Sequence, residues 1–361
     1  MFRLRTLLAG ALALALFGCS STEPAAESTS DAASETSITV TDSHGHEVTL
    51  DQPAERAVFL VENAMLSYLA VGGGPTVVGT GQIWQPTFKE DFLNAAVPGF
   101  TDLPVVASME GGGYDLELLV ELDPDLVVAW ATDADDAGVA AIEETLGVPV
   151  YSVFLTSRDD LAELTTNMGI LLDAEERADE VNLTATHLLS RIEAATADIA
   201  EKPSVYWMWG DVYGTAGTES SVNDVIESAG GVNAIAEWAD EERTQEHPIV
   251  SLETLHVLAP DVIYLWFNDE LDPADILEGK TVGDFDFSTW ADLPAVVNGQ
   301  VFELDDPFAF DLMAAHMPIG VLKIASDINP AAFDGWDLAA EQDALFTALY
   351  GLHYPSYEVA E

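Results

Sequence analysis

The chain has 361 residues, of which 48% are hydrophobic, so its length and composition suit about two domains with ordinary cores. Its 64 acidic residues far outnumber its 11 Lys and Arg residues, which gives a formal net charge of −53 at pH 7. Such a surface repels nucleic acid and anionic lipid headgroups, and a single cysteine excludes disulfides and thiolate metal clusters. The acidic residues are spread along the chain, which indicates a solvated surface suited to high salt. A halophilic source and an ordinary acidic extracellular protein are the two interpretations.

The amino terminus has the pattern of an export signal. Residues 1–19 contain two arginines, then an apolar run too short to span a bilayer comfortably, and end at Cys19. This segment resembles a lipoprotein signal peptide, in which the cysteine is lipidated after cleavage. Phe17 departs from the small residue of that motif, so a plain membrane anchor is the alternative. Residues 20–37 offer almost nothing to bury and are predicted to form a disordered tether. We therefore expect a lipoprotein on the outer face of the cell membrane.

Strand and helix patterns alternate in residues 38–157, the predicted N-terminal lobe. Residues 38–50 alternate polar and apolar side chains around a His-Gly-His turn, which predicts a β-hairpin with two exposed histidines. Residues 57–61 and 76–81 are apolar enough for buried strands, and a helix is predicted to begin at Glu62 between them. A further strand is predicted over 147–154.

Residues 158–202 are predicted to link two lobes. Between 158 and 200 there is no proline and one glycine, and apolar residues recur at helical spacing from Ala174 to Ala200. A helix of that length would span roughly 40 Å, longer than a mean globular helix. We expect one long backbone helix between the lobes, with a lone surface helix as the alternative.

The predicted C-terminal lobe, residues 203–361, repeats the alternation. A strand over 204–214 carries Trp207, Trp209 and Tyr213, and a helix over 221–229 ends at two glycines. A turn at Asn298-Gly299, a strand and an aromatic loop follow within 293–311. Two amphipathic helices, near 314–327 and 338–350, are predicted to complete the chain.

One pattern occurs in both lobes at a constant offset of 136 positions. Residues 115–130 read DLELLVELDPDLVVAW, and residues 251–266 read SLETLHVLAPDVIYLW. Each is a short amphipathic helix ended by proline and followed by a buried strand, the unit of a parallel sheet. The spacing is too long for a solenoid and predicts two Rossmann-like α/β lobes with central sheets. Ligands of such sheets gather at the carboxyl ends of the strands, so Trp130 and Trp266 are expected to face a cleft between the lobes.

These motifs, in this order, resemble the substrate-binding proteins of ABC importers for ferric siderophores, haem and cobalamin. The resemblance is carried by ITVTDSHGHEVTL, the LE…L.PD.V repeat, SVNDVIESAGGVN, VSLETLHVLAPDVI and W..LPAVVNGQVFEL. It implies a two-lobed protein that holds a metal chelate in a shallow cleft and delivers it to a permease dimer with a cytoplasmic ATPase. It also implies that Glu117 and Glu253 dock onto the permease. They are the only acidic residues aligned in both repeat helices, and a helix-start glutamate favoured by the macrodipole is the alternative for each.

Aromatic and polar residues at strand ends and in the following loops are the candidate ligand contacts. They are Glu62, Trp84, Tyr114, Trp130, Trp209, Tyr213, Arg243, His247, Trp266 and Phe308. An aromatic cleft suits a large, flat or partly apolar ligand. Relatives that bind anionic siderophores use several arginines. In this sequence, Arg243 is the only arginine in a predicted cleft loop. This shortage of arginines favours a hydroxamate siderophore, a corrinoid or haem as the ligand. Haem would need an axial ligand, for which Tyr114, Tyr213 and His247 are candidates.

Two other classes of function stay open on sequence grounds. A chelatase-like enzyme would need paired His and carboxylate groups and no export signal, and a scaffold lipoprotein would bind no small molecule. The sequence contains no Gly-rich phosphate loop, nucleophile elbow or His-Glu-x-x-His motif. We therefore expect a monomeric binding protein, not an enzyme, with no intrinsic cofactor, no metal site of its own and no nucleic-acid partner. A ferric siderophore is the first expected ligand.

Overall fold

The computed structural model describes residues 37–81, 89–108, 113–266 and 270–360. The chain divides into two compact units, Met1–Glu35 and Thr36–Glu361, and every described residue belongs to the second. The signal segment with Cys19, nearly all of the tether, and Trp84 therefore lie outside the described residues. In the part of the chain that is described, no helix has both the length and the hydrophobicity needed to cross a membrane.

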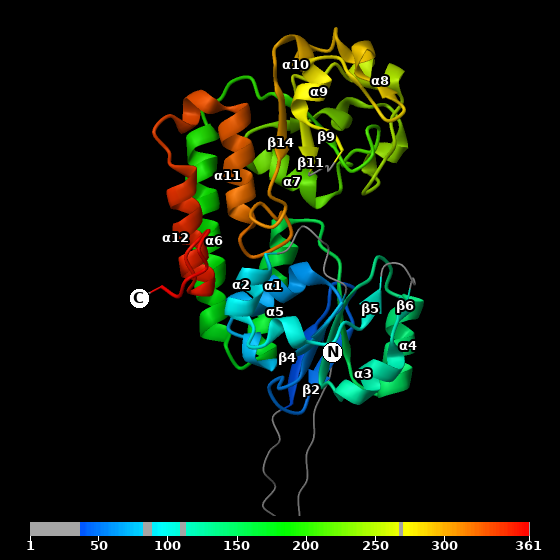
Figure 1. Cartoon of the computed structure of the whole chain (residues 1–361), viewed down its shortest axis with the longest axis vertical. Coiled ribbons are helices and arrows are strands. Elements are labelled where there is room, and N and C mark those ends of the chain that lie inside the picture. Colours follow the sequence, from blue (N-terminus) through cyan, green and yellow to red (C-terminus); the bar gives the residue numbers. More distant parts are fainter. Residues whose placement is uncertain (1–36, 82–88, 109–112, 267–269, 361) are drawn as a thin grey trace, which may run out of the picture. The chain divides into compact units, whose positions relative to one another are not determined.

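The first lobe contains a four-stranded parallel sheet in the order β4-β3-β7-β8 (Figure 1). Its strands are β3 (Ala57–Phe59), β4 (Val77–Thr80), β7 (Leu126–Trp130) and β8 (Val150–Val153). Its helices are α1 (Glu62–Ala70), α2 (Glu90–Ala96), α3 (Leu116–Leu122) and α4 (Ala137–Leu146). Two antiparallel pairs complete it: β1 (Ile38–Thr41) with β2 (Glu47–Leu50), and β5 (Ala107–Ser108) with β6 (Gly113–Tyr114). Strands this apolar are typical of a parallel sheet covered on both faces.

The second lobe has a sheet of the same kind, in the order β10-β9-β11-β14. Its strands are β9 (Ser204–Met208), β10 (Val232–Asn233), β11 (Val262–Trp266) and β14 (Val301–Leu304). Its helices are α7 (Ser221–Ser228), α8 (Leu252–Leu258), α9 (Pro273–Leu277) and α10 (Pro294–Val297), and β12 (Thr281–Val282) pairs with β13 (Phe285–Asp286). The two parallel sheets flanked by helices confirm the predicted α/β fold with two lobes.

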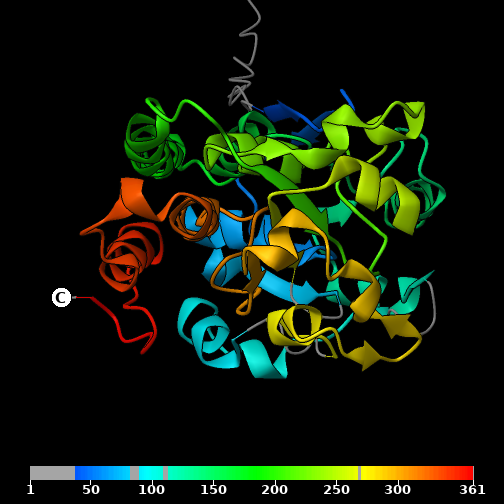
Figure 2. The same cartoon turned by 90° about the horizontal axis from the view of Figure 1, so that it is seen from above.

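The predicted linking segment contains two helices, α5 (Arg158–Leu171) and α6 (Glu175–Thr196). The chain reverses between them at Asp173, whose φ is 56°. With 22 residues, α6 spans about 33 Å and is the long backbone helix, although it ends four residues before Ala200. It packs against α5, α11 (Met317–Ile328) and α12 (Leu338–Tyr350), and the last two run beside it in Figure 1 and are seen end-on next to it in Figure 2.

One hydrophobic core extends through both lobes. It contains Val128 of β7, Ile192 of α6, Tyr264 of β11 and residues of α11 in a single cluster. The alternate residues of each strand point to the opposite face of the sheet. In the first lobe, Val127 belongs to a separate apolar cluster with residues of α3 and α4. In the second lobe, Ile263 belongs to another cluster, with residues of α8, α9 and α10. Each sheet is therefore covered on one face by its own helices and on the other by the core that the lobes share.

The repeat has the same local structure in both lobes. The side chain of Asp115 accepts a hydrogen bond from the backbone of α3, and Ser251 caps α8 in the same way. Both helices end at a residue with positive φ, 46° for Asp123 and 43° for Ala259, ahead of the proline. A left-handed residue followed by proline stops each helix and turns the chain into its strand.

The aspartate after each of these prolines has the same function in the two lobes. Asp125 accepts the backbone N–H of Glu55 at 2.8 Å, just before β3. Asp261 accepts the backbone N–H of Ser204 at 2.9 Å, where β9 begins. Each carboxylate therefore fixes the register of two neighbouring strands, which gives the repeated Pro-Asp pair a structural reason.

Candidate functional site

The carboxyl ends of the two sheets face each other. Asn63, at the start of α1 after β3, donates its Nδ2 to Asp311, in the loop after β14, with the nearer carboxylate oxygen at 2.7 Å. Lys89, beyond β4, forms an ion pair of 3.1 Å with Asp306 of that same loop. Parallel strands end at one edge of their sheet, so these contacts bring the carboxyl-terminal edges of the two sheets together (Figure 1).

Four side chains form a cluster at the carboxyl ends of β9 and β11, here called the C-lobe aromatic cluster: Trp207, Trp209, His247 and Trp266. The rings of Trp209 and Trp266 are nearly parallel, 8° apart, with centroids separated by 5.7 Å. The ring of His247 lies 4.8 Å from that of Trp209. Trp207 is fully buried, Trp209 and Trp266 are half-buried, and His247 is exposed. Strand alternation therefore directs Trp207 and Trp209 to one face, as the sequence predicts.

Backbone contacts between two loops hold His247 beside Trp209. The N–H of Gly217 donates to the carbonyl of Glu246 at 3.1 Å. A Cβ at position 217 would lie 1.7 Å from the carbonyl oxygen of Gln245, so only glycine permits this approach. The sequence predicted His247 from its loop, but its position against Trp209 depends on this long-range pairing.

A second group, the N-lobe aromatic cluster, lies at the ends of β7 and β8 and consists of His44, Trp130 and Phe154. Trp130 and Phe154 make an edge contact at 5.4 Å, and His44 stacks on Phe154 at 6.1 Å. The Nε2 atom of His44 is 2.8 Å from the carbonyl oxygen of Ala131. The turn of the β1-β2 hairpin thus docks on the carboxyl-terminal edge of the N-lobe sheet. No sequence pattern indicated Phe154, and His44 was predicted only as an exposed turn residue.

Two polar atoms near the C-lobe aromatic cluster are buried without a hydrogen-bond partner. They are the indole Nε1 of Trp207 and the hydroxyl of Thr215, in the loop after β9. An unpaired buried donor or acceptor costs about 1–3 kcal/mol. A molecule that supplied partners to these atoms would gain that energy.

Asp311 is a buried carboxyl group at the meeting point of the lobes. Burial raises its pKa to about 7, and the negative charge of Glu62 acts in the same direction. Hydrogen bonds from the backbone of Met313 and from Asn63 act against this shift. Glu62, a predicted ligand contact, is half-buried at the first turn of α1, beside this carboxyl group.

Two predicted ligand contacts are instead packed in the protein. Phe308 is 1% exposed and packs against Phe92 of α2 at 5.0 Å, so its ring supports the loop after β14 and does not face a ligand. Tyr213 packs against Phe285 and Trp290 in the cluster under α8 to α10, on the other face of the C-lobe sheet. Aromatic residues at strand ends look alike in sequence whether they point into the core or out of it, so the packing of these two side chains was not predictable from the sequence.

Tyr114 and Arg243 lie near the strand ends but apart from both aromatic clusters. Tyr114 is half-buried, and its pKa is raised first by burial and then by the charge of Asp136. The guanidinium of Arg243 donates to the carbonyl of Asp240 at 3.1 Å. Neither residue makes a ring contact with the clusters in the described part of the chain, and both stay predictions as ligand contacts.

Glu117 and Glu253 occupy equivalent positions in the first turns of α3 and α8, and both are exposed. Each has an exposed valine one turn further along its helix, Val120 at 52% exposure and Val257 at 83%. Residues three or four apart lie on the same helix face, so each glutamate has an apolar neighbour on the surface.

Within the described ranges, no group of three His, Cys, Asp or Glu side chains is placed so that it could hold a metal ion. The carboxyl-terminal edges of the sheets instead offer aromatic rings and one exposed imidazole. Such an arrangement suits a ligand held by stacking.

Comparisons with known proteins agree with this architecture. A family model described as "Periplasmic binding protein" matches residues 64–308. The molybdate periplasmic binding protein MolA of Haemophilus influenzae aligns with a TM-score of 0.72 at 18% identity, over 88% of this chain and 98% of that chain. CeuE of Helicobacter pylori with Ni(II) bound gives a TM-score of 0.70 at 20% identity, over 89% and 98%. A protein of an ABC-type Fe3+-hydroxamate transport system from Saccharomonospora viridis gives 0.62 at 23% identity, over 81% and 99%.

Proposed function

We propose, from the premise that this chain belongs to the periplasmic binding protein family, that it captures a ferric siderophore between its two aromatic clusters. As a member of that family it is the extracytoplasmic solute-binding component of an ABC importer, whose partners are a permease and an ATPase. The observation that carries the proposal is the pair of aromatic clusters on facing sheet edges. A chelate whose organic part is broad and partly apolar would bury itself against both.

The charges of the described residues favour a ligand with little negative charge. Most basic side chains pair with carboxylates of the protein itself. These pairs are Lys89–Asp306, Arg158–Glu193, Arg177–Glu180, Arg191–Glu341, Lys280–Asp275 and Lys323–Asp327. A catecholate siderophore or a free oxyanion would need unpaired guanidinium groups and would meet a strongly negative surface. A ferric hydroxamate, which carries less charge, is therefore the first candidate.

A corrinoid or haem is the second candidate. It is favoured by the nearly parallel rings of Trp209 and Trp266 and by the imidazole of His247 next to them. A flat macrocycle could stack on the indole rings, while an imidazole is a common axial ligand of its metal. The metal would belong to the cargo and not to the protein.

A ligand panel tests this proposal directly. The purified protein, in high salt, is titrated with a ferric hydroxamate, a ferric catecholate, cobinamide, haem and molybdate while tryptophan fluorescence and melting temperature are followed. The expected responder quenches the fluorescence and stabilises the fold by about 2.7 kcal/mol at 100 times its dissociation constant. Trp266→Leu should lose affinity for it, while Trp336→Leu, which alters a tryptophan packed beside Phe333, should not. If no compound responds, the siderophore proposal fails and a scaffold lipoprotein becomes the better description.

We also propose how the protein is placed and docked. Cys19 would carry a lipid that anchors a monomer to the outer face of the cell membrane, through a tether over residues 20–37. The lobes would comprise residues 38–157 and 203–361. Glu117 and Glu253, one on each lobe, would each contact a basic pocket on one of two permease subunits. Their equivalent, exposed positions in the two repeats support this assignment.

A further inference from the structure

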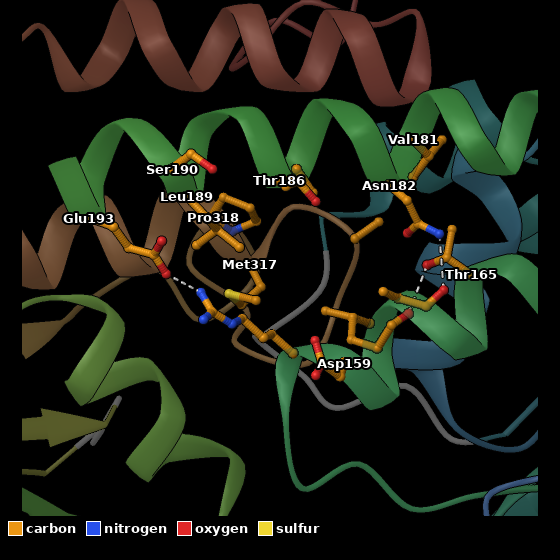
Figure 3. Close-up of a pocket in the computed structure, with 15 residues that line it drawn as sticks. Asp159, Thr165, Val181, Asn182, Thr186, Leu189, Ser190, Glu193, Met317 and Pro318 are labelled. Carbon is orange, nitrogen blue, oxygen red and sulfur yellow. Dashed lines mark hydrogen bonds and ion pairs between the residues drawn. The ribbon is translucent and has the colours of Figure 1, made fainter.

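A cavity of about 250 Å³ lies among α5, α6 and residues 315–318 at the start of α11 (Figure 3). No residue of either aromatic cluster lines it. Its walls come from three segments: α5, which follows the last strand of the first lobe, the backbone helix α6, and the chain that arrives from β14 of the second lobe. It is therefore a separate site from the carboxyl-terminal edges of the sheets.

The cavity is lined by apolar and polar side chains together. Leu161 of α5, Leu189 of α6 and Met317 are among the apolar ones. Asn182 and Glu193 of α6 are among the polar ones, and they lie toward opposite ends of the cavity in Figure 3, with Met317 between them. This mixed lining suits an amphipathic molecule.

The polar groups of the cavity are mainly acceptors. Asn182 donates its Nδ2 to the carbonyl of Ala162 and to Oγ1 of Thr166, each at 3.0 Å, so its amide oxygen is the atom left for a ligand. The carboxylates of Asp159 and Glu193 also line the space. These oxygens would accept hydrogen bonds from an ammonium or hydroxyl group.

The basic group and the helix terminus at this cavity are already engaged. Arg158, the only basic residue among those that line it, binds the carboxylate of Glu193, and its backbone N–H donates to Asp224 at 2.8 Å. At the start of α11, the N–H of Met317 donates to Ala314 at 2.8 Å. The next residue is a proline, which has no N–H. Asp159 and Glu193 together outweigh the single charge of Arg158, so the charges that line the cavity favour a cation over an anion.

We propose that this cavity binds a small organic cation, an alkylammonium with an apolar body. An apolar cavity of about 150 Å³ is known to accept benzene, so the volume here suits a molecule of roughly six to ten heavy atoms. The ammonium would lie toward Asp159 and Glu193, and the hydrocarbon part against Leu161, Leu189 and Met317. The proposal does not depend on the nature of the siderophore or on the aromatic clusters.

Three probes that share a ring but differ in charge test the proposal: cyclohexylammonium, cyclohexanol and cyclohexanecarboxylate. Binding to the purified protein is measured by NMR line broadening of the probe in about 1 M NaCl, where the Debye length is about 3 Å and the overall negative charge is screened. We expect the ammonium to bind about tenfold more tightly than the carboxylate, with the alcohol between them. The reason is that the carboxylates lining the cavity attract the ammonium probe and repel the carboxylate probe. Equal binding of the ammonium and the carboxylate would refute the assignment.

Two tryptophan variants of α6 separate the cavity from the general surface. Ala185→Trp fills the cavity that Ala185 lines and should abolish the ammonium signal. Leu183→Trp places the same side chain at a position 70% exposed on the same helix and should leave the signal unchanged. If Ala185→Trp does not fold, Asp159→Asn is measured in its place. In that variant, cyclohexylammonium should no longer bind more tightly than cyclohexanol. Similar losses in Ala185→Trp and Leu183→Trp would assign the binding to the acidic surface instead.

Discussion

The buried carboxyl group of Asp311 should make the stability of this protein fall as the pH rises from about 4 to 7. Burial raises its pKa from 3.8 to about 7 in the folded chain, so the folded state holds a proton that the unfolded state releases. In this window the folded state binds more protons, and the free energy of unfolding decreases by about 1.4 kcal/mol per pH unit. Between pH 5 and 7 the loss due to this single group is therefore about 2 kcal/mol, because the slope falls to half as the pH reaches the pKa of the folded state.

The comparison of wild type with Asp311→Asn isolates this contribution from the many other carboxylates. Asparagine keeps the size of the side chain and does not titrate, and Asn63 can turn its amide oxygen toward the new amide. Urea unfolding at pH 5 and pH 7, at constant high salt, gives the free energy of unfolding of both proteins. We expect the wild type to lose about 2 kcal/mol more than the variant over this interval. An equal pH dependence in the two proteins would show that Asp311 is ionised in the folded chain and would refute the reasoning.

Three further predictions follow from the repeat and from the amino terminus. Ala259→Gly should raise the free energy of unfolding in urea by about 0.5–1 kcal/mol, because the φ of 43° is strained for alanine. Asp123→Gly should raise it less, since aspartate tolerates a positive φ better than alanine does. Glu117→Gln combined with Glu253→Gln should lower uptake of the ligand by cells without changing ligand affinity. A single exposed ion pair contributes only about 0–1 kcal/mol, so the double variant should lose more uptake than either single variant. A matching loss of ligand affinity would make these glutamates structural. Cys19→Ser should remove lipid labelling, and labelling that persisted would exclude this anchor.

The sequence predicted the fold well because the fold depends on local patterns that occur twice. The helix, proline and buried strand around Pro124 recur around Pro260, and each copy forms the same capped helix and strand. The hairpin of residues 38–50 and the buried strand after it were also predictable from alternation. The long helix was predicted from Ala174, next to the first residue of α6, whereas α5 was not predicted as a separate helix. Asp173, between them, adopts a positive φ without a glycine or proline to indicate it.

The candidate site was predicted only in part, because its geometry depends on contacts between distant segments. The equivalence of Trp130 and Trp266 came from the repeat, and both are half-buried at strand ends. The docking of His44 on the edge of β8 joins residues far apart in sequence, and no local pattern indicates it. The burial of Phe308 under α2 likewise results from a contact between the lobes.

The hydrophobic core that passes through both lobes determines how the protein unfolds. Because Val128, Ile192 and Tyr264 belong to one apolar cluster, exposing the core of one lobe also exposes apolar surface of the other. The lobes are therefore one cooperative unit, and neither sheet has a complete core of its own to retain when the other is lost. Amide exchange from the strands of the two sheets should then occur through the same global opening. Large independent movement of the lobes would cost apolar contact on both sides, so the spacing of the two facing sheet edges is largely fixed before any ligand arrives.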